Sequence, residues 1–212
     1  MSTASIYGDQ EGVLVTEQTQ AKPLSLYGEQ KLHAEAIVEY FCPNHIIYRP
    51  VTAFGVTGRV RLDTLPNTFI YNALAQNHIE VYQPNVIRPF IHAHDFANAI
   101  AWAISGRVVW GETYNLGNKH LTMTKGNLAK FICAETGAAY EEIGGADPEM
   151  RNYDISFEKF EANSIGTMWY DAFAYAIEQF QHYGIDNISA MEKEWDTVSN
   201  TRKFIEKAKG NV

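Results

Sequence analysis

The chain has 212 residues, of which 46% are hydrophobic and 20% charged, with 12 Tyr and 11 Phe. This is the composition of a globular protein, because disordered chains are poor in aromatic residues. The formal net charge of -8 argues against non-specific binding to nucleic acid or to an anionic membrane, but it is compatible with a local positive site for a phosphate. No apolar run approaches the roughly 18 residues that a membrane-spanning helix needs.

The sequence shows neither a targeting signal nor a metal-binding pattern. Its first ten residues, MSTASIYGDQ, lack the basic and apolar regions of a signal peptide, so we expect a cytoplasmic protein. Cys42 and Cys133 stand far apart, which favours two buried thiols over a disulfide. His92 and His94 share one face if they lie on a strand, but they have no third ligand nearby, and no metal site is predicted.

The first quarter of the chain is expected to form one unit of a parallel sheet. Residues 1–8 have the pattern of a strand end with its loop, and a helix is predicted over residues 24–41. The apolar residues of this helix form one stripe with helical spacing: Ala34, Ile37, Val38 and Phe41. Residues 45–51, HIIYRPV, are typical of a buried strand. Strand, crossover helix and strand in this order indicate parallel pairing.

The later elements alternate less regularly. After a glycine loop at residues 54–59, the expected elements are a helix over 66–77, a strand over 78–83, an extended segment over 87–95, a helix over 96–106, a strand over 113–117, a helix over 122–137, and tail helices over 157–163, 169–183 and 189–208. Asp95 is expected to be the N-cap of the 96–106 helix. Gly137 is expected to end the 122–137 helix.

A glycine-rich phosphate loop is missing from the sequence. A dinucleotide-binding sheet opens with a strand, a glycine-rich turn and a helix whose N-terminus binds the pyrophosphate. Neither GxGxxG nor GxxGxxG occurs in this chain, and no acidic residue follows at the spacing that would bind a ribose. We therefore expect the chain to begin in the middle of an α/β layer.

The segment YGEQK places Tyr27 and Lys31 one turn apart on one face of the predicted helix. A free tyrosine is a poor base at neutral pH, and a positive charge one turn away stabilises its phenolate form. Such a pair can exchange a proton with a substrate hydroxyl while a hydride moves to or from a nicotinamide. Taken alone, the spacing is weak evidence and favours a surface Tyr–Lys pair over a catalytic one.

Four further blocks accompany this pair in a fixed order. STASIYG precedes it at residues 2–8, and YRPVTAFG follows at residues 48–55, with RPFIHAHD at residues 88–95 and TYNLG at residues 113–117. The ordered set resembles the extended short-chain dehydrogenase/reductases, in particular the NAD-dependent epimerase/dehydratase family. The resemblance runs from residue 2 to residue 183.

The resemblance implies an α/β fold that contains a partial Rossmann-like parallel sheet and a small mixed α/β substrate-binding lobe. Residues 1–55 would form the C-terminal part of a dinucleotide-binding domain, with the catalytic helix and its flanking strands. Residues 56–212 would form mainly the substrate-binding lobe, with some segments returning to the Rossmann layer.

The resemblance also implies roles for individual residues. Thr3 matches the catalytic hydroxyl, with Ser2 and Ser5 as neighbours, Tyr27 matches the catalytic acid/base, and Lys31 matches the lysine that supports it and binds the nicotinamide ribose.

The other matched positions concern the cofactor wall and the substrate. Pro50, Val51 and Thr52 match the wall beside the cofactor, although the family usually has Asn where Thr52 stands. Asn67 and Arg88 match residues that bind the substrate phosphates, and a permanently charged, forked guanidinium suits that role. The family often has Arg-Asp where this chain has Arg88-Pro89, which blurs the choice of substrate.

The implied function is that of the catalytic and substrate portion of an NAD-dependent nucleotide-sugar epimerase or dehydratase. The alternative is a degenerate or truncated sugar-nucleotide-binding module without activity of its own. The resemblance implies NAD as the cofactor and leaves NADP open. The expected partners are a nucleotide sugar and either a second copy of the chain or a separate N-terminal half, with no nucleic acid and no membrane. We expect the chain to be inactive alone.

Overall fold

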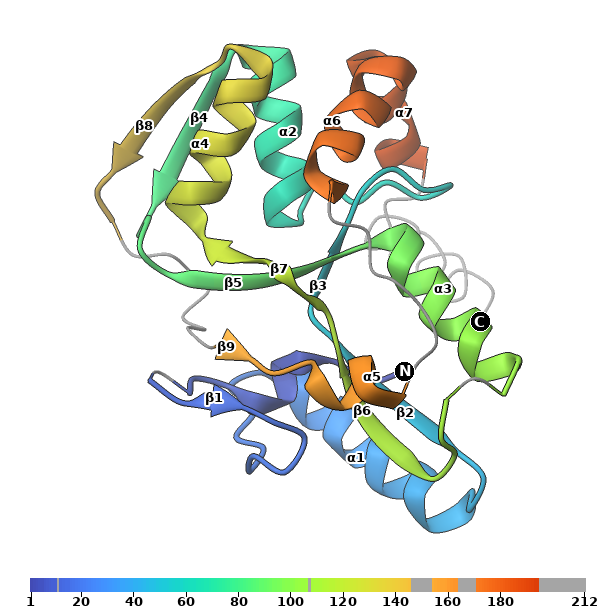
Figure 1. Ribbon diagram of the computed structural model, residues 1–212. Helices are drawn as coiled ribbons and strands as arrows, with labels where there is room; N and C mark the ends of the chain where they lie inside the picture. The colour runs from blue at the N-terminus through green and yellow to red at the C-terminus, as the bar shows by residue number, and fades with distance from the viewer. Residues whose placement is uncertain (11, 107, 146–153, 164–170, 195–212) are drawn as a thin grey trace, which may run out of the picture.

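Helices and short strands alternate along the chain, as the computed structural model shows for residues 1–10, 12–106, 108–145, 154–163 and 171–194 (Figure 1). The helices are the 3-10 helix η1 (Ala4–Tyr7), α1 (Leu26–Phe41), α2 (Leu65–Gln76), α3 (Ala93–Ile104), α4 (Lys125–Thr136), α5 (Glu158–Asn163), α6 (Ala172–Tyr183) and α7 (Ile185–Glu194). The strands are β1 (Leu14–Val15), β2 (Ile46–Pro50), β3 (Thr52–Phe54), β4 (His78–Tyr82), β5 (Ile87–His92), β6 (Glu112–Leu116), β7 (Asn118–Thr124), β8 (Ala139–Ile143) and β9 (Asp154–Ile155).

Most of the strand pairing is parallel and joins segments far apart in the sequence. β2 pairs with β6 from Ile46–Glu112 to Pro50–Leu116, β4 pairs with β8, and β1 pairs with β9, each in parallel. In the three-stranded sheet β3 lies parallel to β5, and β7 lies antiparallel to β5 with an irregular register. The expected mixed α/β architecture is therefore present.

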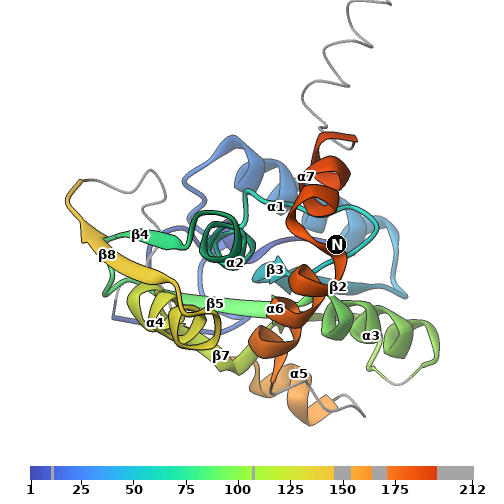
Figure 2. The same cartoon turned by 90° about the horizontal axis from the view of Figure 1, so that it is seen from above.

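The apolar interior consists of two clusters, which we call the sheet core and the lobe core. The sheet core joins η1, β2, β6, α5 and part of α3, and its largest buried side chains are Tyr7, Tyr48, Tyr114, Phe157 and Phe160. The lobe core joins α2, α4, α6, α7, β4 and β5, and its largest buried side chains include Phe54, Phe69, Phe90, Phe173 and Phe180. Figure 1 shows β5 running between these two parts of the molecule, and Figure 2 shows α2, α4 and α6 gathered together from above.

Several expected elements have the expected places. The structure has α1 where residues 24–41 predicted a helix, β2 where residues 45–51 predicted a strand, and α2, β4 and β6 close to their predicted bounds. The left-handed Gly137 ends α4 (φ 78°) as predicted. The expected helices over 169–183 and 189–208 extend in part outside the described residues.

The N-terminal segment differs from its prediction. Residues 1–8 were expected to end a strand, but the chain forms the 3-10 helix η1 there, and only Ser2 keeps a strand-like hydrogen bond, from its N–H to Tyr48 O at 2.8 Å. The Thr3 hydroxyl accepts a hydrogen bond from the N–H of Ser5, which stabilises a helical turn instead of a strand. Gly8 (φ 71°) then redirects the chain, and a Cβ there would lie 1.9 Å from Lys22 O.

Three further predictions were wrong in detail. Helix α3 begins at Ala93, because the His92 side chain is its N-cap, so Asp95 lies inside the first turn and is not the cap. Residues 122–124 belong to β7, and Thr124 caps α4 by accepting from Asn127 N. Strand β8 was not predicted at all. Helix starts depend on which side chain reaches the free N–H groups, which hydrophobic periodicity does not report.

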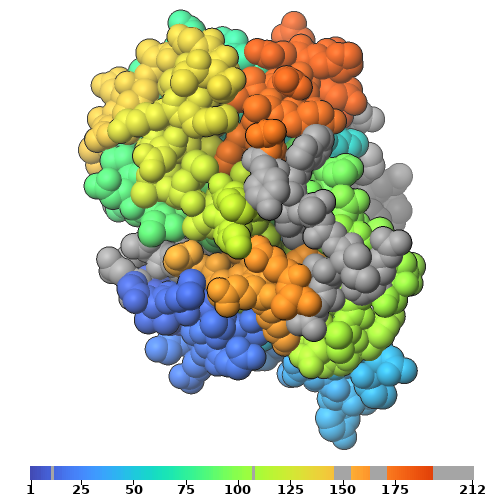
Figure 3. Space-filling model, in the orientation of Figure 1, coloured from blue at the N-terminus to red at the C-terminus, as the bar shows by residue number. Residues whose placement is uncertain are grey.

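Helix α1 is largely uncovered. Of its apolar stripe, Ile37 is 59% exposed, Phe41 is 70% exposed and Val38 is 36% exposed, and the neighbouring Tyr40 is 82% exposed. Only Gly28 and Glu35 are buried along the helix. Figure 3 shows the atoms of α4 and α6 packed side by side at the top of the molecule. These helices cover one another, whereas the apolar side chains of α1 are exposed.

Candidate active site

A cavity of about 660 Å³ lies where η1, α1 and the β2–β3 segment meet the loop before α2 and strand β5. Its lining residues are Met1, Ser2, Thr3, Ala4, Ser5, Tyr27, Lys31, Pro50, Val51, Thr52, Ala53, Arg61, Asp63, Thr64, Leu65, Arg88, Phe90 and Phe96. Of the eight residues predicted for the site, seven line this cavity (Thr3, Tyr27, Lys31, Pro50, Val51, Thr52 and Arg88). Asn67 does not line it.

Tyr27 and Lys31 stand one turn apart near the start of α1. Ser25 is the N-cap of this helix and accepts a hydrogen bond from Gly28 N at 3.2 Å. The Lys31 ammonium lies 5.9 Å from the centre of the Tyr27 ring and donates to Met1 O at 3.3 Å. Tyr27 is 54% exposed, so its hydroxyl is available to a ligand in the cavity.

Gly28 allows α1 to approach the segment that carries Thr3. A Cβ on Gly28 would lie 2.9 Å from Pro23 Cβ and 3.1 Å from Ser5 O. These distances are shorter than ordinary van der Waals contacts, so any larger residue would separate α1 from η1. The closeness of Thr3 and Tyr27 to one cavity therefore depends on a glycine inside the YGEQK segment.

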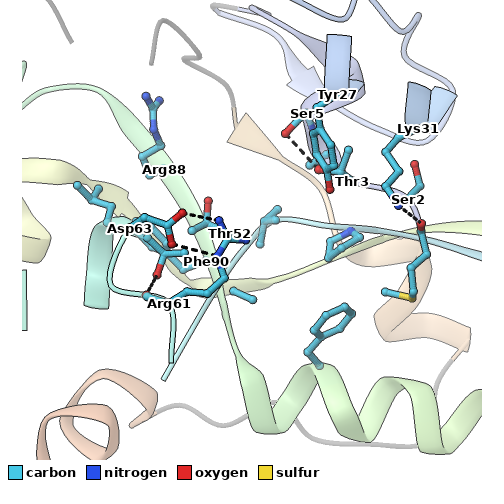
Figure 4. A pocket seen from close by; sticks show the side chains of 18 residues that line it. Ser2, Thr3, Ser5, Tyr27, Lys31, Thr52, Arg61, Asp63, Arg88 and Phe90 are labelled. Atoms are coloured by element: carbon cyan, nitrogen blue, oxygen red, sulfur yellow. Dashed lines mark hydrogen bonds and ion pairs between the residues drawn. The ribbon is translucent and has the colours of Figure 1, made fainter. Parts of the chain in front are cut away.

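Thr3 and Ser2 are hydroxyl residues that line the cavity. The Thr3 hydroxyl donates to Ser5 Oγ at 3.1 Å and accepts from Ser5 N at 3.2 Å. The Ser2 hydroxyl is buried and has no hydrogen-bond partner among the described residues. A buried hydroxyl without a partner is costly. Figure 4 shows Thr3, Ser5, Tyr27 and Lys31 on the same side of the cavity.

The opposite side of the cavity carries two arginines. Arg88 on β5 is buried, and its Nη1 donates to Ile87 O at 3.3 Å. Arg61 lies in the loop before α2 and pairs with Asp63, and this pair is marked by dashed lines in Figure 4. Hydrogen bonds from Arg61 lower the pKa of the Asp63 carboxyl. Together with Lys31, the cavity presents three cationic side chains and one carboxylate.

Asn67 lies beneath the cavity loop and not in the cavity. Its Oδ1 accepts from Gly55 N at 2.9 Å, and its Nδ2 donates to Arg61 O at 2.9 Å. The side chain is 2% exposed. Both ends of the side-chain amide therefore bind the backbone, and a contact of Asn67 with a substrate phosphate stays a prediction.

A buried ion pair that we did not predict joins α1 to β2. Arg49 Nη2 lies 2.7 Å from Glu35 Oε2, and the two side chains are 11% and 4% exposed. Arg49 Nη1 donates to the Tyr7 hydroxyl at 2.9 Å, which donates to Asn115 Oδ1 at 2.6 Å. Glu35 lies one turn after Lys31 and Tyr7 four residues after Thr3. The network therefore connects the two segments that carry the predicted acid–base residues.

The described residues show neither a metal cluster nor a membrane helix. No three His, Cys, Asp or Glu side chains come together anywhere in the described part of the chain. No helix among the residues that the structure describes is long and apolar enough to cross a membrane.

Comparisons with known proteins identify the class. Residues 1–117 match the model of the NAD dependent epimerase/dehydratase family, which is more than half of the 212 residues. The chain therefore belongs to this family. A curated relative, the uncharacterized UDP-glucose epimerase YtcB of Bacillus subtilis, is 30% identical over 121 residues, which cover 55% of this chain and 37% of the relative.

Solved structures share the fold. A dTDP-glucose 4,6-dehydratase from Bacillus anthracis in complex with NAD matches with a TM-score of 0.70 and 22% identity, over 85% of this chain and 60% of that one. A UDP-glucose 4-epimerase from Thermotoga maritima with UDP-glucose matches with a TM-score of 0.74 and 18% identity, over 85% of this chain and 62% of that one. The expected Rossmann-like α/β fold class is thus confirmed. The chain spans less than two thirds of the length of each of these proteins.

Proposed function

We propose that this chain is the catalytic and substrate-binding portion of an NAD-dependent nucleotide-sugar epimerase or dehydratase. One observation carries the proposal. Thr3, Tyr27 and Lys31 line a single cavity whose opposite side holds Arg88. The family and the proteins of similar structure, which include a UDP-glucose 4-epimerase and a dTDP-glucose 4,6-dehydratase, support the same class of substrate.

The acid–base step belongs to Tyr27. Its phenolate form would take the proton from a sugar hydroxyl as the hydride on that carbon passes to the nicotinamide, and the resulting phenol would return the proton when the carbon is reduced. The Lys31 ammonium stabilises the negative charge that develops on the tyrosine oxygen. The Thr3 hydroxyl holds the same sugar oxygen by a hydrogen bond. Arg88 binds the substrate diphosphate as a forked cation.

The residues around the cavity fit the nicotinamide end of NAD. Pro50, Val51 and Thr52 line the same cavity as Tyr27 and Lys31 and would form the wall beside the nicotinamide. NAD, when bound, supplies the hydride acceptor. The pyrophosphate has no matching glycine-rich loop in these 212 residues, so we expect the other end of the dinucleotide to require groups that these residues do not supply.

The missing loop also favours a second candidate function. A sugar-nucleotide-binding module would keep Arg88 and the cavity but would not catalyse a reaction. The two candidates differ in whether a supplied glycine-rich partner restores turnover, because a module would bind the sugar nucleotide with or without that partner.

The uncovered face of α1 supports an association of this chain with a further copy or with a separate N-terminal half. Ile37, Val38, Tyr40 and Phe41 are exposed there, and a contiguous apolar surface favours contact with another protein. Sedimentation of the purified chain, alone and mixed with a glycine-rich βαβ polypeptide from the family, distinguishes the two partners.

Calorimetric titration tests the proposed function. The purified chain is titrated with NAD and with UDP-, dTDP-, GDP- and CDP-sugars. We expect weak binding of one nucleotide sugar and poor binding of NAD, because two or three hydrogen bonds of about 0.5–1.5 kcal/mol each do not offset an association cost of several kcal/mol. Turnover that appears with a glycine-rich partner and disappears in Tyr27→Phe supports the enzyme. No binding of any nucleotide sugar contradicts both candidates.

A further inference from the structure

Arg61 lines the cavity, and the family resemblance assigned no role to it. Its Nε donates to Asp63 Oδ1 at 3.0 Å and its Nη2 to Asp63 Oδ2 at 2.6 Å. Both side chains are largely exposed, at 61% and 64%. An exposed ion pair contributes little to stability. Exchanging the Asp63 carboxylate for another oxyanion therefore costs the folded chain little.

The backbone of Arg61 is fixed although its side chain is exposed. Its carbonyl oxygen accepts hydrogen bonds from Asn67 Nδ2 at 2.9 Å and from Thr64 Oγ1 at 3.2 Å. Asn67 is buried and also binds Gly55 N at 2.9 Å. It thereby ties together both ends of the segment from Gly55 to Arg61. The backbone from which the Arg61 guanidinium extends is therefore held in place beside the cavity.

The cavity has an excess of positive charge in a chain whose formal net charge is -8. Its charged lining side chains are Lys31, Arg61 and Arg88 against Asp63. Figure 4 shows Arg61 and Asp63 on the side of the cavity that faces Tyr27. Cations concentrated in a cleft attract an anionic ligand, and Asp63, the carboxylate among the described lining residues, is bound to Arg61.

We propose that Arg61 is an oxyanion-binding residue of this site, that Asn67 positions it, and that Asp63 is its resting partner, which a phosphate or carboxylate of the ligand displaces. A guanidinium binds either oxyanion through two parallel N–H groups. The inference deepens the proposed function and rests on it for the presence of a nucleotide sugar in the cavity. The oxyanion comes either from the diphosphate or from a carboxylate on the sugar.

The test compares binding by the full chain with binding by three variants. Wild type, Arg61→Gln, Asp63→Asn and Arg59→Gln are titrated with inorganic pyrophosphate, UDP, UDP-glucose and UDP-glucuronate. Arg59 is the matched control, because it lies in the same loop and is exposed but does not line the cavity. All three changes are at exposed residues and should leave the fold intact.

We expect Arg61→Gln to weaken binding by about tenfold, because the variant loses a charge-assisted pair with the ligand. Asp63→Asn should strengthen binding by about threefold, because the ligand no longer competes with an exposed ion pair to Arg61. Arg59→Gln should change it by less than about twofold. A loss in Arg61→Gln that extends to pyrophosphate and UDP identifies the diphosphate as the source. A loss confined to UDP-glucuronate identifies the sugar carboxylate.

Carbon-13 NMR of the Asp63 carboxyl measures its pKa and gives a second readout, which a general loss of positive charge in the cavity would not reproduce. In the free chain the hydrogen bonds from Arg61 lower the pKa of Asp63. A saturating ligand that displaces Asp63 returns this pKa toward its ordinary value, and in Arg61→Gln the ligand has no such effect. An unchanged Asp63 signal in a wild-type chain saturated with ligand overturns the proposal.

The outcomes separate this inference from the proposed function. Nucleotide-sugar binding that Arg61→Gln leaves unchanged, or that Arg59→Gln weakens equally, overturns the role of Arg61 and leaves the proposed function standing. If pyrophosphate binds and depends on Arg61 but no nucleotide sugar binds, the role of Arg61 stands and the proposed function is overturned. A chain that binds none of the four probes contradicts both.

Discussion

The lobe core and the sheet core are stabilised by different chemistry. The lobe core is apolar throughout, with Phe54 and Phe173 stacked at 4.6 Å between ring centres. The sheet core contains three buried tyrosines, and beside it lies the Arg49–Glu35 pair. Burial raises the pKa of Tyr7 to about 12, against the opposing effect of Arg49.

The two kinds of contact contribute differently to the stability of the fold and to the positions of the site residues. Apolar contacts are non-directional and tolerate small shifts, whereas hydrogen bonds fix distances and angles. The polar network lies beside the segments that carry Thr3, Tyr27 and Lys31 (η1 and α1), where the proposed proton transfer would require close placement. We infer that the lobe core supplies most of the stability, and that the network sets the geometry of the site.

Breaking the ion pair gives the largest effect on the sheet core. Arg49→Met leaves Glu35 charged and buried, and removal of one partner of such a pair costs about 3–5 kcal/mol. We expect urea unfolding to shift by this amount, with loss of hydrogen-exchange protection in α1 before α4. The double variant Glu35→Leu with Arg49→Met should recover most of the stability. No recovery in the double variant would show that packing, and not charge, accounts for the loss.

Acid should weaken the lobe side through His92, which packs edge-on against Phe54. Burial lowers the pKa of His92 to about 4, from 6.5. The unfolded chain then binds the proton more tightly than the native chain, so stability is full above pH 6.5 and falls between pH 6.5 and 4, by on the order of 3 kcal/mol. Urea unfolding at several pH values measures this slope. His92→Asn, whose side-chain oxygen can replace the Nδ1 of His92 as the N-cap acceptor, should flatten it.

Gly28→Ala tests the close approach of α1 to η1. Helix propensity alone would stabilise the variant by about 1 kcal/mol, but the new Cβ meets Pro23 Cβ at 2.9 Å and Ser5 O at 3.1 Å. We expect the steric clash to outweigh the gain in helix propensity and to destabilise the chain by about 1 kcal/mol. Gly58→Ala is the control, because no atom lies within 4 Å of its Cβ position. Equal stabilisation in both variants would mean that the space between α1 and η1 accommodates an additional methyl group without a clash.

The smallest change in stability is expected on the uncovered face of α1. Ile37→Ser with Phe41→Ser replaces two exposed side chains, so the free energy of unfolding should move by less than about 0.5 kcal/mol per site. Self-association, measured by sedimentation velocity, should decrease if this face is the contact. A large loss of stability would instead show that the face is buried in solution.

Local patterns predicted the elements that depend on local spacing. Helical periodicity found α1, and the YGEQK spacing placed Tyr27 and Lys31 on one turn of it. Strand β8 was missed because its residues, AYEEI, are mostly exposed and are defined by pairing with β4, some sixty positions earlier. Pairing over such a distance leaves no mark in the hydrophobic period.

The candidate site was predictable in its residue types and less so in its contacts. The ordered motifs gave seven of the eight expected residues their places around the cavity. Asn67 does not line the cavity, and nothing in the sequence indicated this, because a residue type does not tell which way an amide points. Arg61 was missed because its loop has no periodic pattern, and the Arg49–Glu35 pair because its partners lie 14 residues apart on different elements.

The parallel pairing of the strands has a consequence for how the chain acquires its fold during synthesis. Leu14 pairs with Asp154, and β2 with β6 across more than sixty residues, so little of the sheet can close early. Non-local parallel pairing slows folding. At about 5–20 residues per second, a ribosome that has made β1 needs roughly 7–28 s more to make β9. During that interval α1, with its apolar stripe, is exposed to chaperones and to other nascent chains.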